Sequence, residues 1–339
     1  MKQRLQNKVA GSTLTLPISC VLTTVMWWLP WRGYSTELLV GWLLCVLTAY
    51  VLMELTAANV LLRIRSRMIS SLYLLLMGAC SFLHPVGIGN VLALLLVLVF
   101  FVLFRSYEER YSTTDAFHAA VCLSLGSLLW PPFLLLAPVV ISCQGIFLRS
   151  LSWRMTGAWI IGLLVPYWFW LVIAYFMDNL ALFTAHIAAI FTPFSEPFYW
   201  QWIVELAQTL DWQNFWPSFS ESLRLHFIAH CLEACAFAYV LLLALTGFIH
   251  YVRKNYDDKI RVRMCYYCLM SIQVVLLLWL LVQPAYFRPL FSMLILTTVP
   301  SAAHFFALTH TWLTNAWFIL SALFFLFLCF LSFFSPLTS

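Results

Sequence analysis

Residues 253–263 read RKNYDDKIRVR, and residues 264–282 directly after them read MCYYCLMSIQVVLLLWLLV. The second stretch has no charged side chain and is about as long as the ~20 residues that a helix needs to cross the hydrocarbon core of a membrane. It is continuously apolar rather than alternating, which indicates a helix and not a strand of a membrane barrel. The basic stretch is typical of a cytoplasmic loop. We therefore predict a transmembrane helix that begins at the cytoplasmic side.

The same composition extends over the whole chain of 339 residues. Hydrophobic residues make up 63% of the chain and charged residues 9%, whereas about a quarter of the residues in a soluble domain are charged. A folded surface needs more charge than this to stay in solution. The composition excludes a soluble enzyme, a secreted disulfide scaffold, a nucleic-acid-binding protein and a disordered protein. It predicts an all-α, polytopic membrane protein.

Eleven apolar stretches of the chain are candidate membrane spans. Lipid offers no hydrogen-bond partner to a backbone group, so each stretch is expected to be a helix, which satisfies its own backbone. We predict a single integral membrane domain over residues 1–339, folded as a bundle of about eleven transmembrane helices. The stretches lie at residues 13–30, 37–62, 68–84, 89–104, 115–130, 131–148, 155–177, 223–250, 264–282, 290–308 and 311–334.

The lysines and arginines fall mainly on one predicted side of this bundle. If the N-terminus is inside, the inner segments hold fifteen of them, and the outer segments hold only Arg32, Arg224 and Arg288. Such a bias is typical of the cytoplasmic side. We therefore expect a cytoplasmic N-terminus and a location in a bacterial inner membrane. The fifteen inner residues are Lys2, Arg4, Lys8, Arg63, Arg65, Arg67, Arg105, Arg110, Arg149, Arg154, Arg253, Lys254, Lys259, Arg261 and Arg263.

One long outer segment, residues 178–222, separates two of the predicted spans. It contains aspartates and glutamates but no lysine or arginine. Within residues 199–210, aromatic and aliphatic side chains fall on one helical face and polar side chains on the other. We predict an external segment whose amphipathic helix lies on the membrane surface.

Neither the cysteines nor the sequence motifs predict a metal or a cofactor. Most of the ten cysteines lie within apolar runs, where cysteine behaves as a small hydrophobic residue. Cys265 and Cys268 form a C-x-x-C pair, but no second pair or nearby histidine completes a zinc site. The sequence contains no P-loop, no G-x-G-x-x-G and no serine-hydrolase elbow. We interpret Asp257 and Asp258, in the basic loop, as part of a topology determinant rather than of a phosphate site.

Two stretches of the chain follow the same order of features. Residues 81–106 begin with Ser-Phe-Leu-His-Pro and end with Phe-Arg-Ser, and residues 127–150 begin with Ser-Leu-Leu-Trp-Pro and end with Leu-Arg-Ser. In each, a proline ends a helix at the outer side and an arginine anchors the next helix at the inner side. The pattern is typical of any helical hairpin in a membrane, and it also fits a fold built from parallel repeats.

The middle of the chain carries an ordered set of short motifs, namely Gly126-Ser127-Leu128-Leu129-Trp130-Pro131-Pro132, Phe147-Leu148-Arg149, Trp153-Arg154 and GLLVPYW at residues 162–168. Over about residues 60–177 this order resembles the polytopic glycosyltransferases of the GT-C type. Those enzymes take sugars from polyprenyl-phosphate donors at the outer face of a membrane. The resemblance implies a protein that binds membrane lipids and a polyprenyl-phosphate-linked sugar and acts in envelope glycan biogenesis.

The chain departs from the GT-C pattern in its first external loop. GT-C enzymes carry an acidic residue or pair there, in a sizeable loop, whereas residues 31–37 offer only Glu37. A shared fold would then have lost its activity or placed it elsewhere. Two other functions stay open. One is a transporter or flippase, which Glu54 within the second span and the repeat would support, and the other is a non-enzymatic membrane scaffold.

Polar residues at the outer helix ends are the candidate site residues. His226, His230 and Glu233 share one helical face, where they could bind a metal, move a proton or form a polar seam between helices. We predict catalytic roles for His230, Glu233 and Glu37. We predict substrate-binding roles for Arg288, His84 and His226, because arginine pairs well with phosphate and all three residues reach the outer side. His304, within the tenth span, is interpreted as a helix-packing contact.

Overall fold

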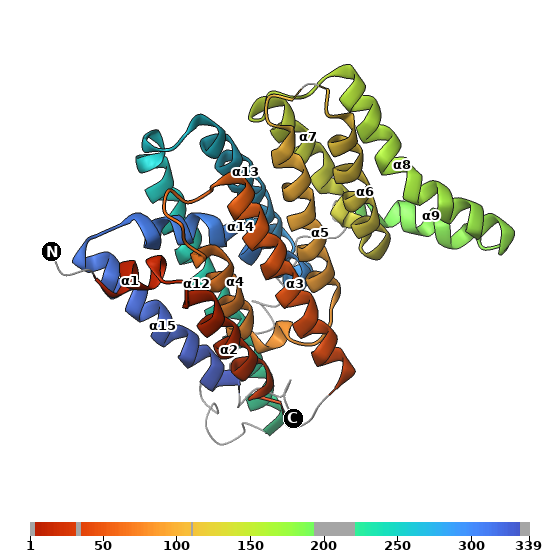
Figure 1. Ribbon diagram of the computed structural model, residues 1–339. Coiled ribbons are helices and arrows are strands. Elements are labelled where there is room, and N and C mark those ends of the chain that lie inside the picture. Colours follow the sequence, from red (N-terminus) through yellow and green to blue (C-terminus); the bar gives the residue numbers. More distant parts are fainter. Residues whose placement is uncertain (1–3, 32–34, 110, 193–220, 333–339) are drawn as a thin grey trace.

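The computed structural model describes residues 4–31, 35–109, 111–192 and 221–332, and for residues 221–230 it describes the backbone alone. All regular elements in these ranges are helices, with no strand among them (Figure 1). The predicted all-α fold class is therefore confirmed for these residues. The predicted amphipathic helix at residues 199–210 lies outside the described residues.

The described helices follow the predicted apolar stretches closely. The α-helices are α1 (Leu5–Gly11), α2 (Thr15–Trp28), α3 (Thr36–Asn59), α4 (Met68–Ala79), α5 (Ile88–Leu103), α6 (Thr113–Leu129), α7 (Ala137–Ile146), α8 (Trp153–Phe176), α9 (Leu180–Ala189), α12 (Glu221–Lys254), α13 (Ile260–Val282), α14 (Phe287–Leu308) and α15 (Trp312–Ser332). Short 3-10 turns join several of them, at Ser81–Leu83, Phe104–Ser106, Pro131–Leu136, Asn255–Asp257 and Pro284–Tyr286.

Fewer helices than expected are long enough to cross a membrane alone. Within the described residues seven helices are long and apolar enough, or up to eight if α1 and α2, bent by 100° at their junction, form one span. The seven are Thr36–Asn59, Ile88–Ser106, Trp153–Phe176, Cys231–Asp257, Ile260–Val282, Pro284–Leu308 and Trp312–Ser332. The 12 residues of α4 reach only about 18 Å at 1.5 Å per residue. The number of eleven spans and the orientation of the N-terminus stay predictions.

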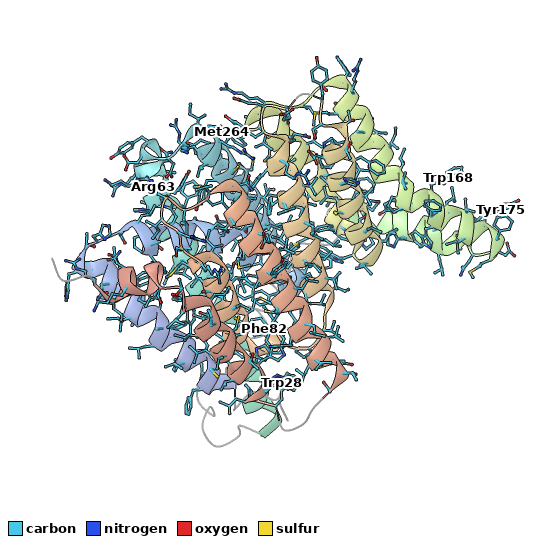
Figure 2. All side chains as sticks on the ribbon, viewed as in Figure 1. Trp28, Arg63, Phe82, Trp168, Tyr175 and Met264 are labelled. Carbon is cyan, nitrogen blue, oxygen red and sulfur yellow. The ribbon has the colours of Figure 1, made fainter. Side chains whose placement is uncertain are left out.

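The connecting segments gather at two opposite ends of the bundle. We call the end that contains Arg261 the basic end. There the Nη2 atom of Arg261 donates to the Asn59 side chain at 3.1 Å and to the Phe104 carbonyl at 3.3 Å. At the other end, the aromatic end, the Phe82 and Phe287 rings lie 6.0 Å apart. Figure 2 shows the same division, with Arg63 and Met264 at one end and Trp28 and Phe82 at the other. Segments that the charge bias places on one side thus lie together.

Helix α14 is the centre of the bundle and is buried along almost its whole length. It contacts α4, α5, α12 and α13. The helix pairs approach closely where one of them has a glycine: a Cβ on Gly247 would lie 2.9 Å from the Ala302 amide nitrogen. Small residues at such crossings let helix backbones pack tightly in a membrane, where van der Waals contact is the main attraction between helices.

Helices α6 and α8 form a closely packed pair on one flank, from which α8 and α9 extend away from the rest of the bundle (Figure 1). Ser152 caps α8, because its hydroxyl accepts the Met155 amide at 3.4 Å. α9 falls within the expected external segment at residues 178–222 and has no buried residue. His186 on α9 joins it to α6 through the Ser127 carbonyl at 3.0 Å.

Candidate functional site

Arg288 and Glu233 meet at the aromatic end, although 55 residues separate them in the sequence. The Nε and Nη2 atoms of Arg288 each lie 3.3 Å from the same carboxylate oxygen of Glu233. The Arg288 side chain is 53% exposed and that of Glu233 is 20% exposed. The ion pair is therefore open on one side. The Arg288 guanidinium can bind a further anion while it stays paired with the Glu233 carboxylate.

The helix that carries Glu233 also carries His226 and His230, but their side chains lie outside the described residues. The backbone is helical from Glu221 to Lys254, so positions 226, 230 and 233 share one face of α12. Arg288 consequently contacts a residue one helical turn away from His230. The roles of the two histidines stay predictions.

His84 is fully buried, and its ring is held on three sides. The Trp27 ring stacks on it at 4.0 Å. Its Nε2 bonds the Gly78 carbonyl at 3.1 Å, and its Nδ1 receives the Trp31 indole at 3.4 Å. Both ring nitrogens are thus occupied by the protein itself, and a substrate would have to displace Trp31 to reach Nδ1.

Glu37 lies in the first turn of α3, which Ser35 caps by accepting the Leu38 amide at 3.2 Å. Its side chain is exposed, and its carbonyl accepts the Val86 amide at 3.0 Å. Glu37 and His84 are thus brought to one place through the backbone. Two pairs of the six predicted site residues are thus brought together. Glu233 and Arg288 form a side-chain ion pair, and a backbone hydrogen bond joins Glu37 to the segment that contains His84.

A second polar cluster lies at the basic end and centres on Asp258, whose side chain is 2% exposed. One Asp258 oxygen accepts the Arg63 Nε at 2.5 Å, and the other lies 3.1 Å from His304 Nε2. Arg63 also pairs with Asp257 at 3.2 Å and donates to the Lys254 carbonyl at 3.2 Å. Burial alone would raise the pKa of Asp258, but the hydrogen bonds from His304 and Arg63 outweigh burial and lower it.

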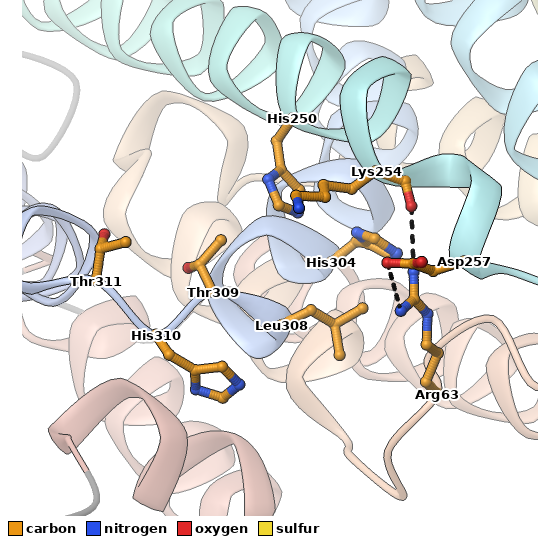
Figure 3. Close-up of a pocket in the computed structure, with 9 residues that line it drawn as sticks. All are labelled: Arg63, His250, Lys254, Asp257, His304, Leu308, Thr309, His310 and Thr311. Atoms are coloured by element: carbon orange, nitrogen blue, oxygen red, sulfur yellow. Dashed lines mark hydrogen bonds and ion pairs between the residues drawn. The ribbon is translucent and has the colours of Figure 1, made fainter.

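A pocket of about 280 Å³ opens beside this cluster (Figure 3). Its walls are the end of α12 with the 3-10 turn after it, the end of α14, and the segments between α3 and α4 and between α14 and α15. Its lining is mostly polar, although it lies between apolar helices. The lining residues are Arg63, His250, Lys254, Asp257, His304, Leu308, Thr309, His310 and Thr311.

Two imidazole nitrogens beside the pocket have no hydrogen-bond partner within the part of the chain that the structure describes. They are Nδ1 of His304 and Nε2 of His250. The two rings lie 5.6 Å apart, and the Tyr251 and Tyr266 rings enclose His304 at 5.0 and 5.5 Å. A buried polar atom without a partner is costly, and a bound water or ion is one arrangement that would satisfy it.

The N-terminal helix closes one side of this region. Gln6 is fully buried and bonds the backbone and side chain of Thr309 and the hydroxyl of Thr314 at 3.1 Å. Arg4 bonds the His310 carbonyl. The segment between α14 and α15, which lines the pocket, is thereby fixed to α1.

Reasoning from sequence missed this cluster, because His304 was interpreted as a packing contact and Asp257 with Asp258 as a topology determinant. His304 does pack against rings, but it also bonds a buried carboxylate. A usable signal was present: two adjacent aspartates in a loop of lysines and arginines, on the same predicted side as the end of the His304 helix.

Comparisons with models of known families, with curated proteins and with solved structures found no match for this chain. Within the described ranges, no group of three or more histidine, cysteine, aspartate or glutamate side chains could hold a metal ion.

Proposed function

We propose that this multi-pass membrane protein acts on lipid-linked sugars in envelope glycan biogenesis, in the inner membrane of a bacterium. The single observation that carries the proposal is the half-exposed Arg288 guanidinium at the aromatic end, paired with Glu233 at 3.3 Å. The polytopic helical fold and the resemblance of residues 60–177 to GT-C enzymes support it.

The chemistry of the proposal divides between two groups. Arg288 would hold the phosphate of a polyprenyl-phosphate donor, since a planar guanidinium binds phosphate with two parallel hydrogen bonds. Glu233, or His230 one turn before it, would take the proton from the acceptor hydroxyl. Glu37, His84 and His226 are proposed to complete the outer site. Because His84 is fully enclosed by Trp27, Trp31 and Gly78, its part would be to position the segment at residues 84–88.

The experiment is a binding and transfer assay with the purified protein in lipid nanodiscs, using a radiolabelled polyprenyl-phosphate sugar as the probe. We expect the probe to bind to the wild-type protein and Arg288→Gln to weaken binding at least about tenfold, since hydrogen bonds to a charged group contribute roughly 1.5–3 kcal/mol. Arg105→Gln is the matched control, because Arg105 is an exposed arginine at the basic end. Equal binding by both variants would refute the proposed site.

A second candidate function, a transporter or flippase, is favoured by the position of α14. This buried helix has Arg288 with its ion pair near one end and His304 with the pocket near the other. Pro300 lies inside the helix, where a missing hydrogen bond permits a bend. Movement of a fluorescent polyprenyl-phosphate sugar between leaflets of proteoliposomes, without sugar transfer, would favour this function over the enzyme.

A further inference from the structure

We propose that the pocket at the basic end binds a phosphate-class anion, which the Lys254 ammonium and the free ring nitrogens of His250 and His304 hold. The site lies at the opposite end of the bundle from Arg288 and is independent of the function proposed above.

The carboxylates beside the pocket are already paired within the protein. Arg63 is occupied by its own partners, because it pairs with both Asp257 and Asp258 and also donates to a backbone carbonyl. These carboxylates are therefore already neutralised in part, and Asp258 uses both of its oxygens within the protein. The side chains that still have nitrogen atoms to offer are His250 and Lys254 near the end of α12 and His304 on α14.

Three side chains around the pocket have nitrogen atoms that can contact a ligand. Lys254 is exposed, and its described contact is the face of the Tyr256 ring at 5.9 Å from Nζ. His304 lines the pocket and is fixed by Asp258 at Nε2, which leaves its buried Nδ1 without a partner within the described residues. His250 Nε2 is the second nitrogen without a partner. The Lys254 ammonium donates, and a ring nitrogen of a neutral histidine either donates or accepts, so the three side chains can bind a phosphate through both its oxygens and its hydroxyls.

A metal ion fits this arrangement less well than an anion. The two aspartates are held by Arg63, and the nearest side chain that is free to move, Lys254, is a cation that would repel a metal. No set of three ligands converges within the described residues. The charge and the geometry therefore both favour an oxyanion.

With neutral histidines, the pocket lining carries a net positive charge. Arg63 and Lys254 are each positive and Asp257 is negative, whereas Asp258 pairs with Arg63 beside the pocket and is not part of the lining. In a neutral imidazole, the nitrogen without a hydrogen accepts, so Nδ1 of His304 can accept a hydroxyl of a protonated phosphate. Arg4, which bonds the His310 carbonyl, is a further charged group nearby. Tyr251 and Tyr266, which enclose His304, carry no charge.

Two sources of phosphate are compatible with the position of the pocket. It lies at the end of the apolar helices α12 and α14, where a lipid head group would be, and it also opens beside the polar loop that a soluble phosphate would reach. The recognised chemistry is the same in both cases. Separate probes can therefore identify the source.

The experiment uses the full-length protein in nanodiscs of phosphatidylcholine, titrated calorimetrically with inorganic phosphate at neutral pH. A second arm uses nanodiscs that contain phosphatidic acid and counts the molecules of this lipid retained per protein by mass spectrometry. We expect at least one probe to bind to the wild-type protein. Lys254→Gln and His250→Gln should each weaken that probe about tenfold, whereas Lys259→Gln, an exposed lysine of the same loop, should not.

The two arms separate the sources, and each can refute the site. Binding of phosphate identifies a soluble ligand, and retention of phosphatidic acid alone identifies a lipid head group. His304→Gln risks misfolding because His304 is buried against Asp258, so Lys254 and His250 carry the test. The proposal is overturned if neither probe binds to the wild-type protein, or if Lys254→Gln behaves like Lys259→Gln.

Discussion

Ser106 and Ser150, the last residues of the two hairpins with matching sequences, touch each other inside the bundle. Their hydroxyl oxygens lie 3.3 Å apart, and both side chains are fully buried. Gln144 extends the contact: its amide nitrogen donates to Ser106 at 3.4 Å, and its oxygen accepts the Trp159 indole at 2.6 Å. The Glu108 amide also bonds the Leu148 carbonyl at 3.0 Å. The two hairpins are therefore joined at their last residues, Ser106 and Ser150.

This junction predicts a large effect of a conservative change at Gln144. Gln144→Leu keeps the size of the side chain but leaves the buried Trp159 indole without an acceptor, which costs about 1–3 kcal/mol. We expect a lower melting temperature in detergent, followed by tryptophan fluorescence. Ser142→Ala on the same helix is the control, because the Ser142 hydroxyl is exposed and bonds only its own helix. A Gln144 variant as stable as the Ser142 variant would contradict a structural role for the junction.

Two glycines of α8 predict opposite outcomes for the same substitution. A Cβ on Gly162 would lie 2.7 Å from the Phe117 carbonyl and from Ala120, so Gly162→Ala should push α6 and α8 apart at a cost of about 1–3 kcal/mol. A Cβ on Gly157 would meet nothing within 4 Å, so Gly157→Ala should stabilise the helix by roughly 0.5–1 kcal/mol. Thermal unfolding of both variants in the same detergent checks the pair. Equal shifts would show that α6 and α8 do not pack as described.

The Asp258 ion pairs predict a pH-dependent part of the stability. Because Arg63 and His304 lower the pKa of Asp258, the carboxylate stabilises the folded state at every pH above its unfolded pKa of about 4. That contribution is lost as the pH falls from there through the lower pKa of the folded state. Asp258→Asn should remove this acid-sensitive part of the unfolding curve.

The same substitution should also destabilise the protein at neutral pH by about 1–3 kcal/mol, since it removes the buried carboxylate that Arg63 and His304 bond, while Arg63 keeps its ion pair with Asp257. Asp257→Asn is the control, because the Asp257 side chain is 42% exposed and an exposed pair contributes only about 0–1 kcal/mol. If the two variants had the same stability between about pH 3 and pH 7, the buried pairs would contribute nothing to folding.

The sequence predicts the helices of this fold better than their number of crossings or their polar contacts. Continuous apolar runs locate α3, α8 and α13 because a helix in lipid must be apolar along its length. They do not show that α4 is too short to be a full span. The residue at which a helix ends depends on local turns such as Ser81–Leu83. The pairing of Asp258 with His304 spans 46 residues. It depends on how α12 and α14 pack, which no local pattern encodes.

The division of the connecting segments between two ends predicts their accessibility. Asp257→Cys at the basic end and Asp178→Cys after α8 replace exposed aspartates that the charge pattern predicts to lie on opposite sides of the membrane. An impermeant thiol reagent applied to intact cells should label the cysteine at position 178 and not that at position 257, with the unmodified chain and its ten cysteines as baseline. Labelling of both positions would contradict the division, and labelling of position 257 alone would reverse the predicted orientation.

The Arg288–Glu233 pair predicts that folding and function respond differently to an exchange of charges. Arg288→Glu or Glu233→Arg alone places like charges about 3.3 Å apart across α12 and α14 and should lower stability. The double variant restores the ion pair, so its melting temperature should return toward that of the wild type. Binding of a polyprenyl-phosphate sugar should not return, because the open guanidinium would then project from α12 rather than from α14. If the double variant also regains binding, the phosphate does not depend on where Arg288 holds its charge. If stability stays low in the double variant, the two side chains do not interact as the structure places them.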